Sequence, residues 1–255
     1  MHSSSIIEVI QLKKQYKVGF RQKKTLVALC DIDFQVQEKE VFGIIGLNGA
    51  GKSTLLKILM GFILPDSGQA SIFSQHATNA TIHNKIGYLP EHPSLSQVLT
   101  PYELLLFACQ VEGRKKPAAK RDIEEILEQV QLTVFSKTPL RKFSKGMLQR
   151  VALAYAMVLK PKILILDEPM SGLDPLGRQL VIDLIHERHL QGTTIIFCSH
   201  ILSDVERICD RIGILDKGML KTVITPEELN KVHSQRGKTP LETMFLQIVG
   251  KKYVQ

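Results

Sequence analysis

The sequence predicts an α/β fold that combines a parallel β-sheet with an antiparallel β region and an all-helical insert. Residues 6–12 and 26–36 alternate or run β-branched and apolar, which predicts two strands joined by a basic loop. Helical spacing replaces these patterns between about 96 and 158. Continuous apolar runs are typical of parallel strands that are buried on both faces. Apolar strands of the parallel sheet are expected at residues 41–46, 162–166 and 193–198, and the last two are continuous runs of this kind.

A glycine-rich loop follows the first of these expected strands and opens a helix that is expected over 52–60. Glycines let successive backbone N–H groups turn inward around an anion, Lys52 reaches the β- and γ-phosphates, and Ser53 offers its hydroxyl to Mg²⁺. The helix N-terminus also favours negative charge. A chance match and a plain strand-to-helix turn are the alternatives, but the flanking elements favour nucleotide binding. The predicted ATP-binding residues here are Gly46, Leu47, Asn48, Gly49, Ala50, Gly51, Lys52, Ser53 and Thr54.

Capping signals predict where several other helices begin. Thr100 and Glu103 form a capping box with a proline between them, which predicts a helix to about residue 112. Asp174, followed by proline, caps a helix that is expected to reach residue 191. The remaining expected elements are strands near 69–73 and 85–89, helices over 118–131 and 144–159, a turn at Asp216-Lys217-Gly218, late helices opened by Thr225 and Thr239, and a polar linker at 234–238.

Two carboxylates, Asp167 and Glu168, follow the apolar run 162–166. An aspartate at a strand end beside a phosphate loop can hold Mg²⁺ directly or through water, which suits Asp167. Adjacent residues of an extended chain point in opposite directions, so Glu168 is left to accept a proton from the attacking water or to orient it. Acidic residues often end strands, so the pair gains its meaning only together with the phosphate loop.

Ser144 and His200 are candidates that carry little weight alone. Ser144 is an N-cap followed by Lys145-Gly146-Met147, which offers N–H donors and a hydroxyl to an anion. An ordinary capped helix is the alternative, and it is the favoured one for this segment taken alone. His200 follows the run 193–198 at the sheet edge where ligands bind, yet a lone histidine there is more often structural.

Composition limits the class of protein. With 255 residues, the chain can bury a substantial core, and its hydrophobic and charged fractions of 44% and 23% are ordinary for soluble globular proteins. No apolar stretch approaches the roughly 18 residues that span a bilayer, and no secretory signal is recognised, so a cytoplasmic protein is expected. The 4 cysteines are scattered, which predicts reduced, mostly buried thiols rather than a metal site.

The formal net charge is +8, and basic residues cluster within 13–24, 114–121 and 137–145. Such clusters could serve nucleic acid, an anionic membrane surface or nucleotide phosphates. No aromatic residues are interleaved with them, and no zinc-finger or RNA-recognition pattern is present. Solvated faces near a membrane are therefore favoured over a nucleic-acid groove.

The order of these motifs resembles the ATP-binding cassette (ABC) ATPase family, specifically the nucleotide-binding subunits of ABC transporters. The resemblance implies a P-loop NTPase (RecA-like) core with an antiparallel β subdomain and an inserted all-helical subdomain at about 96–158. Residues 1–232 would form the ABC ATPase domain, and 233–255 a short C-terminal helical extension. The motifs that carry the resemblance are Tyr16, Gly46–Thr54, Gly87–Glu91, Phe143–Met147, Leu166–Pro169, Ser171–Asp174 and His200.

The resemblance also implies a role for individual residues. Tyr16 would stack on adenine, with a plain surface tyrosine as the alternative. Ser144 and Gly146 would contact the γ-phosphate of ATP bound to the opposite subunit of a head-to-tail dimer. Asp174 would belong to the loop that communicates across this dimer. The implied catalytic residues are Glu168 as general base, His200 as γ-phosphate sensor, and Lys52.

Two departures from the family pattern affect the site. The usual signature is Leu-Ser-Gly-Gly-Gln, whereas this chain has Lys145 and Met147 at two of its positions but keeps the serine and the glycine that touch phosphate. Glu91 occupies the position that normally holds a glutamine near Mg²⁺ and the lytic water. A carboxylate there could coordinate the metal, although it adds negative charge near the phosphates. The expected metal ligands are Ser53, Asp167 and Glu91.

The function implied is that of an ATP-binding and ATP-hydrolysing subunit of an ABC transporter, resembling the export-type single-domain subfamily. Two copies, expected to form a homodimer, would close around two Mg-ATP molecules and drive a separate transmembrane permease that docks on the helical insert. The chain would then be peripheral on the cytoplasmic face of the membrane, without direct nucleic-acid contact. The alternatives are a nucleic-acid-linked ABC ATPase of the repair or translation type and a nucleotide-dependent scaffold that does not hydrolyse ATP.

Overall fold

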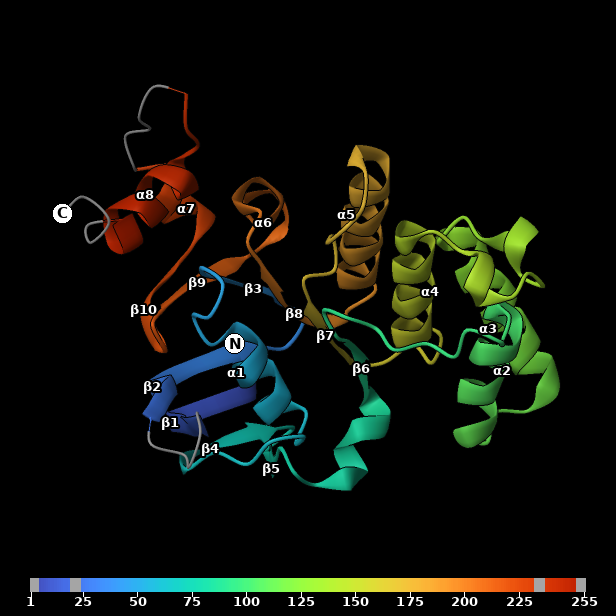
Figure 1. The fold of residues 1–255 in the computed structure, drawn as a ribbon, viewed down its shortest axis with the longest axis horizontal. Helices are drawn as coiled ribbons and strands as arrows, with labels where there is room; N and C mark the ends of the chain where they lie inside the picture. The colour runs from blue at the N-terminus through green and yellow to red at the C-terminus, as the bar shows by residue number, and fades with distance from the viewer. Residues whose placement is uncertain (1–4, 19–23, 232–236, 251–255) are drawn as a thin grey trace. The chain divides into compact units, whose positions relative to one another are not determined.

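The computed structural model describes residues 5–18, 24–231 and 237–250 and is shown in Figure 1. The chain forms two compact units. The first unit comprises Met1–Ile82 and Thr194–Gln255, and the second unit comprises His83–Thr193. Among the described residues, no helix combines the length and the apolar character needed to cross a bilayer.

The first unit contains an antiparallel sheet of four strands. Strand β1 (Ser5–Val18) lies between β2 (Lys24–Gln37) and β4 (Ser67–Ile72), and β5 (Gln75–His76) pairs with β4. All three pairings are antiparallel. The predicted strands at 6–12, 26–36 and 69–73 are therefore confirmed, and the first two are longer than expected.

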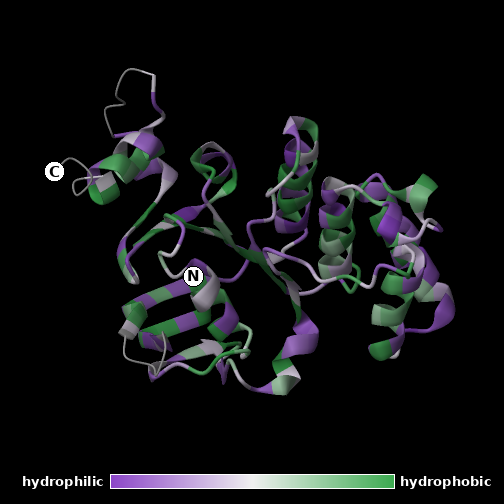
Figure 2. Ribbon diagram, viewed as in Figure 1, coloured by the Kyte–Doolittle hydropathy of each residue, from purple (hydrophilic) through white to green (hydrophobic). Residues whose placement is uncertain are grey.

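The same unit contains a second group of strands. Strand β3 (Val41–Ile45) pairs in parallel with both β8 (Thr194–Ser199) and β9 (Arg211–Asp216), and β9 pairs antiparallel with β10 (Met219–Ile224). Figure 2 shows the apolar character along these inner strands. Every residue of β3 and β8 is buried, and for β8 the continuous apolar run predicts this burial.

In the described part of the first unit there are four α-helices. Helix α1 (Lys52–Leu59) follows β3, and the late helices α7 (Pro226–Leu229) and α8 (Pro240–Val249) begin at the two predicted capping boxes. Helix α6 (Leu202–Ile208) was not predicted, because it has seven residues and no side chain caps its first turn at Ile201. The short connection Gln75–His76 forms a strand that sequence patterning also missed.

The second unit pairs strands β6 (Ile86–Leu89) and β7 (Ile163–Asp167) in parallel. Its helices match the sequence prediction, and two short 3₁₀ turns between α3 and α4 were missed. A Cβ on Gly87 would lie 2.0 Å from the carbonyl oxygen of Ala156, so a glycine is required where α4 packs on β6. The helices are α2 (Pro101–Val111), α3 (Lys116–Gln129), α4 (Lys145–Met157) and α5 (Pro175–Leu190).

Some predictions lie outside the described residues. Most of the expected linker at 234–238 and the expected domain boundary after residue 232 belong to this group, as do Arg21 and Lys23 of the first basic cluster.

Candidate functional site

The loop between β3 and α1 has the backbone of a phosphate cradle. Gly49 and Gly51 have φ angles of 80° and 111°, a region that favours glycine. A Cβ on Gly51 would lie 2.4 Å from the carbonyl oxygen of Ala28, and one on Gly46 would lie 2.4 Å from that of Leu215. At Gly49, by contrast, nothing lies within 4 Å of such an atom. The loop is thus packed tightly at its two ends and open at its middle, where an anion would sit.

The side chain of Lys52 folds back against the backbone of this loop. Its side chain is 6% exposed, and Nζ donates a hydrogen bond of 2.7 Å to the carbonyl oxygen of Gly46. Helix α1 begins at Gly51 without a capping side chain and without an acidic residue in its first turn. Its leading N–H groups therefore favour an anion, which fits a triphosphate, and Ser53 in the same turn has the hydroxyl that suits Mg²⁺.

A tight turn between β9 and β10 supports the loop. The N–H of Gly218 donates to the carbonyl oxygen of Ala50 at 2.9 Å, and the carbonyl oxygen of Gly218 accepts from the N–H of Cys30 at 2.7 Å. The predicted turn at residues 216–218 is confirmed, and Lys217 and Gly218 both have positive φ angles. The turn thereby connects the phosphate loop to strand β2.

The strand register places His200 beside the phosphate loop. In the parallel pair of β3 and β8, Ile45 is opposite Ser199. The next residues, Gly46 and His200, therefore leave neighbouring strands at the same carboxyl edge, where ligands bind in α/β sheets. His200 is exposed.

Tyr16 lies half-buried on β1, opposite Leu26 of β2. The ammonium group of Lys14 is 5.6 Å from the centroid of the Tyr16 ring and 2.9 Å from a carboxylate oxygen of Asp66. A cation therefore covers one face of the ring that is predicted to stack on adenine.

In the second unit, the acidic candidates also meet at a carboxyl edge. Leu89 of β6 is opposite Leu166 of β7, so the segments that carry Glu91 and Asp167 leave the two strands side by side. Asp167 is 1% exposed and Glu168 is 6% exposed, whereas Glu91 is exposed. Carboxylates at this edge have the chemistry that Mg²⁺ prefers.

Glu168 does not continue strand β7, so the predicted relation between the Asp167 and Glu168 side chains is wrong. The sequence predicts that Asp167 and Glu168 point in opposite directions because both lie on an extended chain. In the structure β7 ends at Asp167, and Glu168 has a φ angle of 51°, in the left-handed region. The direction of the Glu168 side chain is therefore set by a backbone turn and not by strand alternation.

Ser144 is the N-cap of α4, which agrees with the alternative interpretation of this segment as an ordinary capped helix. Its hydroxyl accepts a hydrogen bond of 3.3 Å from the N–H of Met147 at the start of α4. Ser144 and Gly146 nevertheless line a hollow of about 520 Å³, which they share with Lys145 and Asp174. Asp174 in turn caps α5 by accepting from the N–H of Gly177 at 2.7 Å. The structure thus brings the segments 144–147 and 171–174 together.

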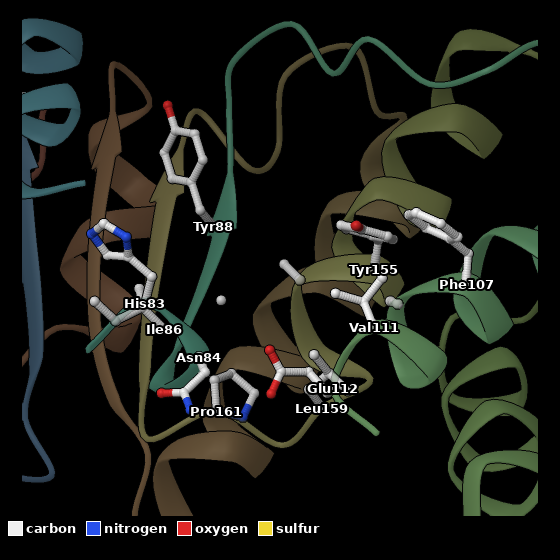
Figure 3. A pocket seen from close by; sticks show the side chains of 13 residues that line it. His83, Asn84, Ile86, Tyr88, Phe107, Val111, Glu112, Tyr155, Leu159 and Pro161 are labelled. Atoms are coloured by element: carbon white, nitrogen blue, oxygen red, sulfur yellow. The ribbon is translucent and has the colours of Figure 1, made fainter. Parts of the chain in front are cut away.

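A second hollow of about 320 Å³ lies elsewhere in this unit, and Figure 3 shows its lining. Phe107 and Val111 of α2 and Tyr155 of α4 form an apolar wall, and they are 57%, 68% and 38% exposed. His83 and Tyr88 lie on the opposite side in Figure 3. This groove was not predicted from the sequence, because apolar residues at helical spacing are also typical of a buried face. We refer to the hollow lined by Phe107, Val111 and Tyr155 as the α2–α4 groove.

A glycine cradle with a buried lysine, at the start of a helix and at the carboxyl edge of parallel strands, defines a P-loop nucleotide-binding protein. Residues 29–171 match the family model described as ABC transporter. The chain belongs to this ABC transporter family.

Relatives and solved structures agree with this assignment. The chain is 42% identical, over 86% of its length, to an ABC transporter ATP-binding protein of Nostoc sp.. It is 38% identical, over 89% of its length, to the bacitracin transport ATP-binding protein BcrA of Bacillus licheniformis, of which it covers 72%. A solved ATP-binding subunit of an ABC transporter has 31% identity and a TM-score of 0.83, with 96% of this chain and 99% of that one covered. The predicted fold class is therefore confirmed. The chain spans 66% of the length of the Nostoc relative.

Proposed function

We propose that this chain binds and hydrolyses ATP as the nucleotide-binding subunit of an ABC transporter. The single observation that carries the proposal is the phosphate loop. It is open at Gly49, and the side chain of Lys52 is buried against it. The exposed position of His200, beside the start of this loop, supports the same reading. Two copies would close head to tail around two Mg-ATP molecules.

The residues of the chain divide the work of phosphoryl transfer. Lys52 and the leading N–H groups of α1 neutralise and orient the phosphates, because this reaction depends on positioning and charge more than on covalent catalysis. Glu168 accepts the proton of the attacking water, and His200 contacts the γ-phosphate. Bound Mg²⁺ supplies further positive charge to the phosphates. The residues that would hold it are Ser53, Asp167 and Glu91.

The first experiment measures phosphate release and nucleotide affinity for the full chain with Mg²⁺. We expect Glu168→Gln to abolish steady-state hydrolysis while ATP affinity stays within about twofold of that of the unchanged chain, since the amide keeps its size but cannot accept the proton. Asp183→Asn, on the exposed part of α5, is the matched control and should leave both quantities unchanged. Hydrolysis by the Glu168→Gln variant at the normal rate would refute the assigned base.

The permease is proposed to dock in the α2–α4 groove. Exposed aromatic and apolar side chains gathered around one hollow are typical of a protein interaction site, and a helix of a membrane subunit is the occupant that an ABC transporter requires. Through such a partner the chain would lie on the cytoplasmic face of the membrane. Export is proposed as the direction of transport; the relationship to BcrA, which is named a bacitracin transport ATP-binding protein, supports transport itself as the process.

Variants of the groove test this docking site. Phe107→Ser with Val111→Ser should release the chain from membranes that contain its permease, while hydrolysis by the free chain is preserved. Val134→Ser changes a side chain that is 85% exposed outside the groove, and it should have no effect on either measurement. Unchanged membrane association of the double variant would place the permease contact elsewhere.

A further inference from the structure

The side chain of Gln149 is buried inside the second unit, and its amide is directed at the segment that follows β7. Gln149 is 5% exposed, and its Nε2 atom lies 3.1 Å from the carbonyl oxygen of Pro169 and 3.5 Å from that of Glu168. An amide group has two N–H donors, so it can serve both carbonyls. These carbonyls belong to the two consecutive peptide units that follow the Cα atom of Glu168, on either side of Pro169.

Glu168 adopts a backbone conformation that needs such support. Its φ angle of 51° lies in a region that non-glycine residues seldom occupy, and the next residue is a proline, which restricts it further. Residues in sparsely populated conformations persist where their surroundings fix them, and they cluster at functional sites. The carbonyl oxygen of Glu168 also accepts a hydrogen bond of 3.0 Å from the N–H of Ser171, which closes the turn.

Lys145 holds the other end of the same segment. It lies four residues before Gln149, so the two side chains share one face of α4. Its stem crosses Gly172, where an added Cβ would lie 2.8 Å from Lys145 Cε. Gly172 has a φ angle of 73°. One face of α4 therefore contacts the segment 168–172 at both of its ends.

We propose that Gln149 is a positioning residue for Glu168, and that Lys145 assists it from the other end of the segment. The inference rests on the proposed role of Glu168 as the general base. Gln149 does not touch the reacting atoms. It fixes the peptide units on which the direction of the Glu168 carboxylate depends. Because Ser144 begins the same helix, a phosphate bound at Ser144 and the base at Glu168 would be connected through one rigid element.

The test replaces the amide by an apolar group of similar length in the full chain. In Gln149→Met we expect kcat for ATP hydrolysis to fall tenfold or more, while KM and the affinity for Mg-ATP change less than about twofold, since misplacement of a reacting group costs rate more than binding. Lys145→Gly should give a smaller fall in kcat. Gln110→Met, at an exposed position of α2, is the matched control and should leave all values unchanged.

Hydrogen exchange provides a readout that does not depend on activity. The amide of Ser171 should exchange at least about tenfold faster in Gln149→Met, whereas amides of α2 should keep their rates. Rapid exchange at Ser171 together with reduced kcat supports the proposal. Normal kcat and normal exchange at Ser171 overturn it, and so does a uniform rise in exchange across the second unit, since that indicates a general loss of stability.

The same set of proteins separates this inference from the proposed function. If the unchanged chain hydrolyses ATP and Glu168→Gln does not, then a Gln149→Met variant with normal kcat overturns only the positioning role. If the unchanged chain fails to hydrolyse ATP with its permease present, the proposed function fails. Exchange at Ser171 then still reports whether Gln149 holds the segment.

Discussion

The ammonium group of Lys52 lies 2.7 Å from the carbonyl oxygen of Gly46, the first residue of its own loop. The lysine side chain thus folds back toward the backbone of its own loop, where its ammonium group also lies 3.4 Å from the carbonyl oxygen of Leu47. A bound phosphate would replace loop carbonyls as the partner of this cation. The loop is therefore preformed for an anion, and its lysine is already held among backbone acceptors.

We expect Lys52→Met to weaken Mg-ATP binding about 10- to 100-fold, because a hydrogen bond to a charged group contributes about 1.5–3 kcal/mol. Methionine keeps most of the stem and removes the charge. Equilibrium binding of a fluorescent ATP analogue would measure the change. Lys57→Met, at an exposed position later in α1, is the matched control. Equal affinities of the two variants would contradict a phosphate-binding role for Lys52.

Gly87 gives a test of packing between β6 and α4. A Cβ there would lie 2.0 Å from the carbonyl oxygen of Ala156, and a backbone atom cannot move aside as a flexible side chain can. We expect Gly87→Val to lower Tm by about 5–10 °C, corresponding to a few kcal/mol of overpacking. Gly250→Ala, where the nearest atoms are 3.8 Å from the added carbon, should leave Tm almost unchanged. Calorimetry on both variants would measure the two Tm values, and an unchanged Tm for Gly87→Val would contradict the close packing of β6 and α4.

The cysteines should differ strongly in reactivity. Cys30 is exposed, whereas Cys109, Cys198 and Cys209 are buried. Burial raises the pKa of the Cys109 thiol and raises that of Cys209 well above its usual value, so both form less of the reactive thiolate near pH 8. Alkylation of the folded chain should modify Cys30 first, and the buried thiols only after denaturant is added. Mass spectrometry of the products measures this order, and rapid labelling of Cys209 would disagree with its burial.

The capping box of α2 should make part of its stability depend on pH. The N–H and the hydroxyl of Thr100 donate to the Glu103 carboxylate and hold its pKa below the usual value of 4.5. A carboxyl whose pKa is lowered on folding stabilises the fold above its usual pKa, and this contribution is lost as the pH falls through the lowered value. Glu103→Gln should therefore be less stable than the unchanged chain at neutral pH.

The two chains should become equally stable in acid, at a pH below the lowered pKa. Urea unfolding of both chains across this range measures the difference directly. A constant difference at every pH would show that the ionised carboxylate is not the source of the stabilisation.

Local signals made most of the fold predictable. Each capping box is complete within four residues, so the starts of α2, α7 and α8 could be predicted without knowledge of the tertiary structure. The buried strands β3, β7 and β8 could also be predicted locally, because each is a short apolar segment of the sequence. The phosphate loop was predictable because phosphate binding by backbone N–H groups needs glycines at a fixed spacing.

The features that escaped prediction depend on contacts between distant parts of the chain. The left-handed turn at Glu168 is accompanied by hydrogen bonds from Gln149, nineteen residues earlier, and no local pattern encodes it. The α2–α4 groove forms only where Phe107 and Tyr155 meet in space. Helix α6 was missed because it is short and has no capping side chain that would mark its start in the sequence.

The three Thr-Pro capping boxes have a consequence for how the sequence can change over time. Each box fixes the first turn of its helix by contacts among four neighbours, so insertions or deletions in the preceding connection need not shift the register of that helix. Connections ahead of these boxes can therefore vary in length between species while the helices retain their faces. The capping boxes thus allow the loops to change in length while the helices keep their register.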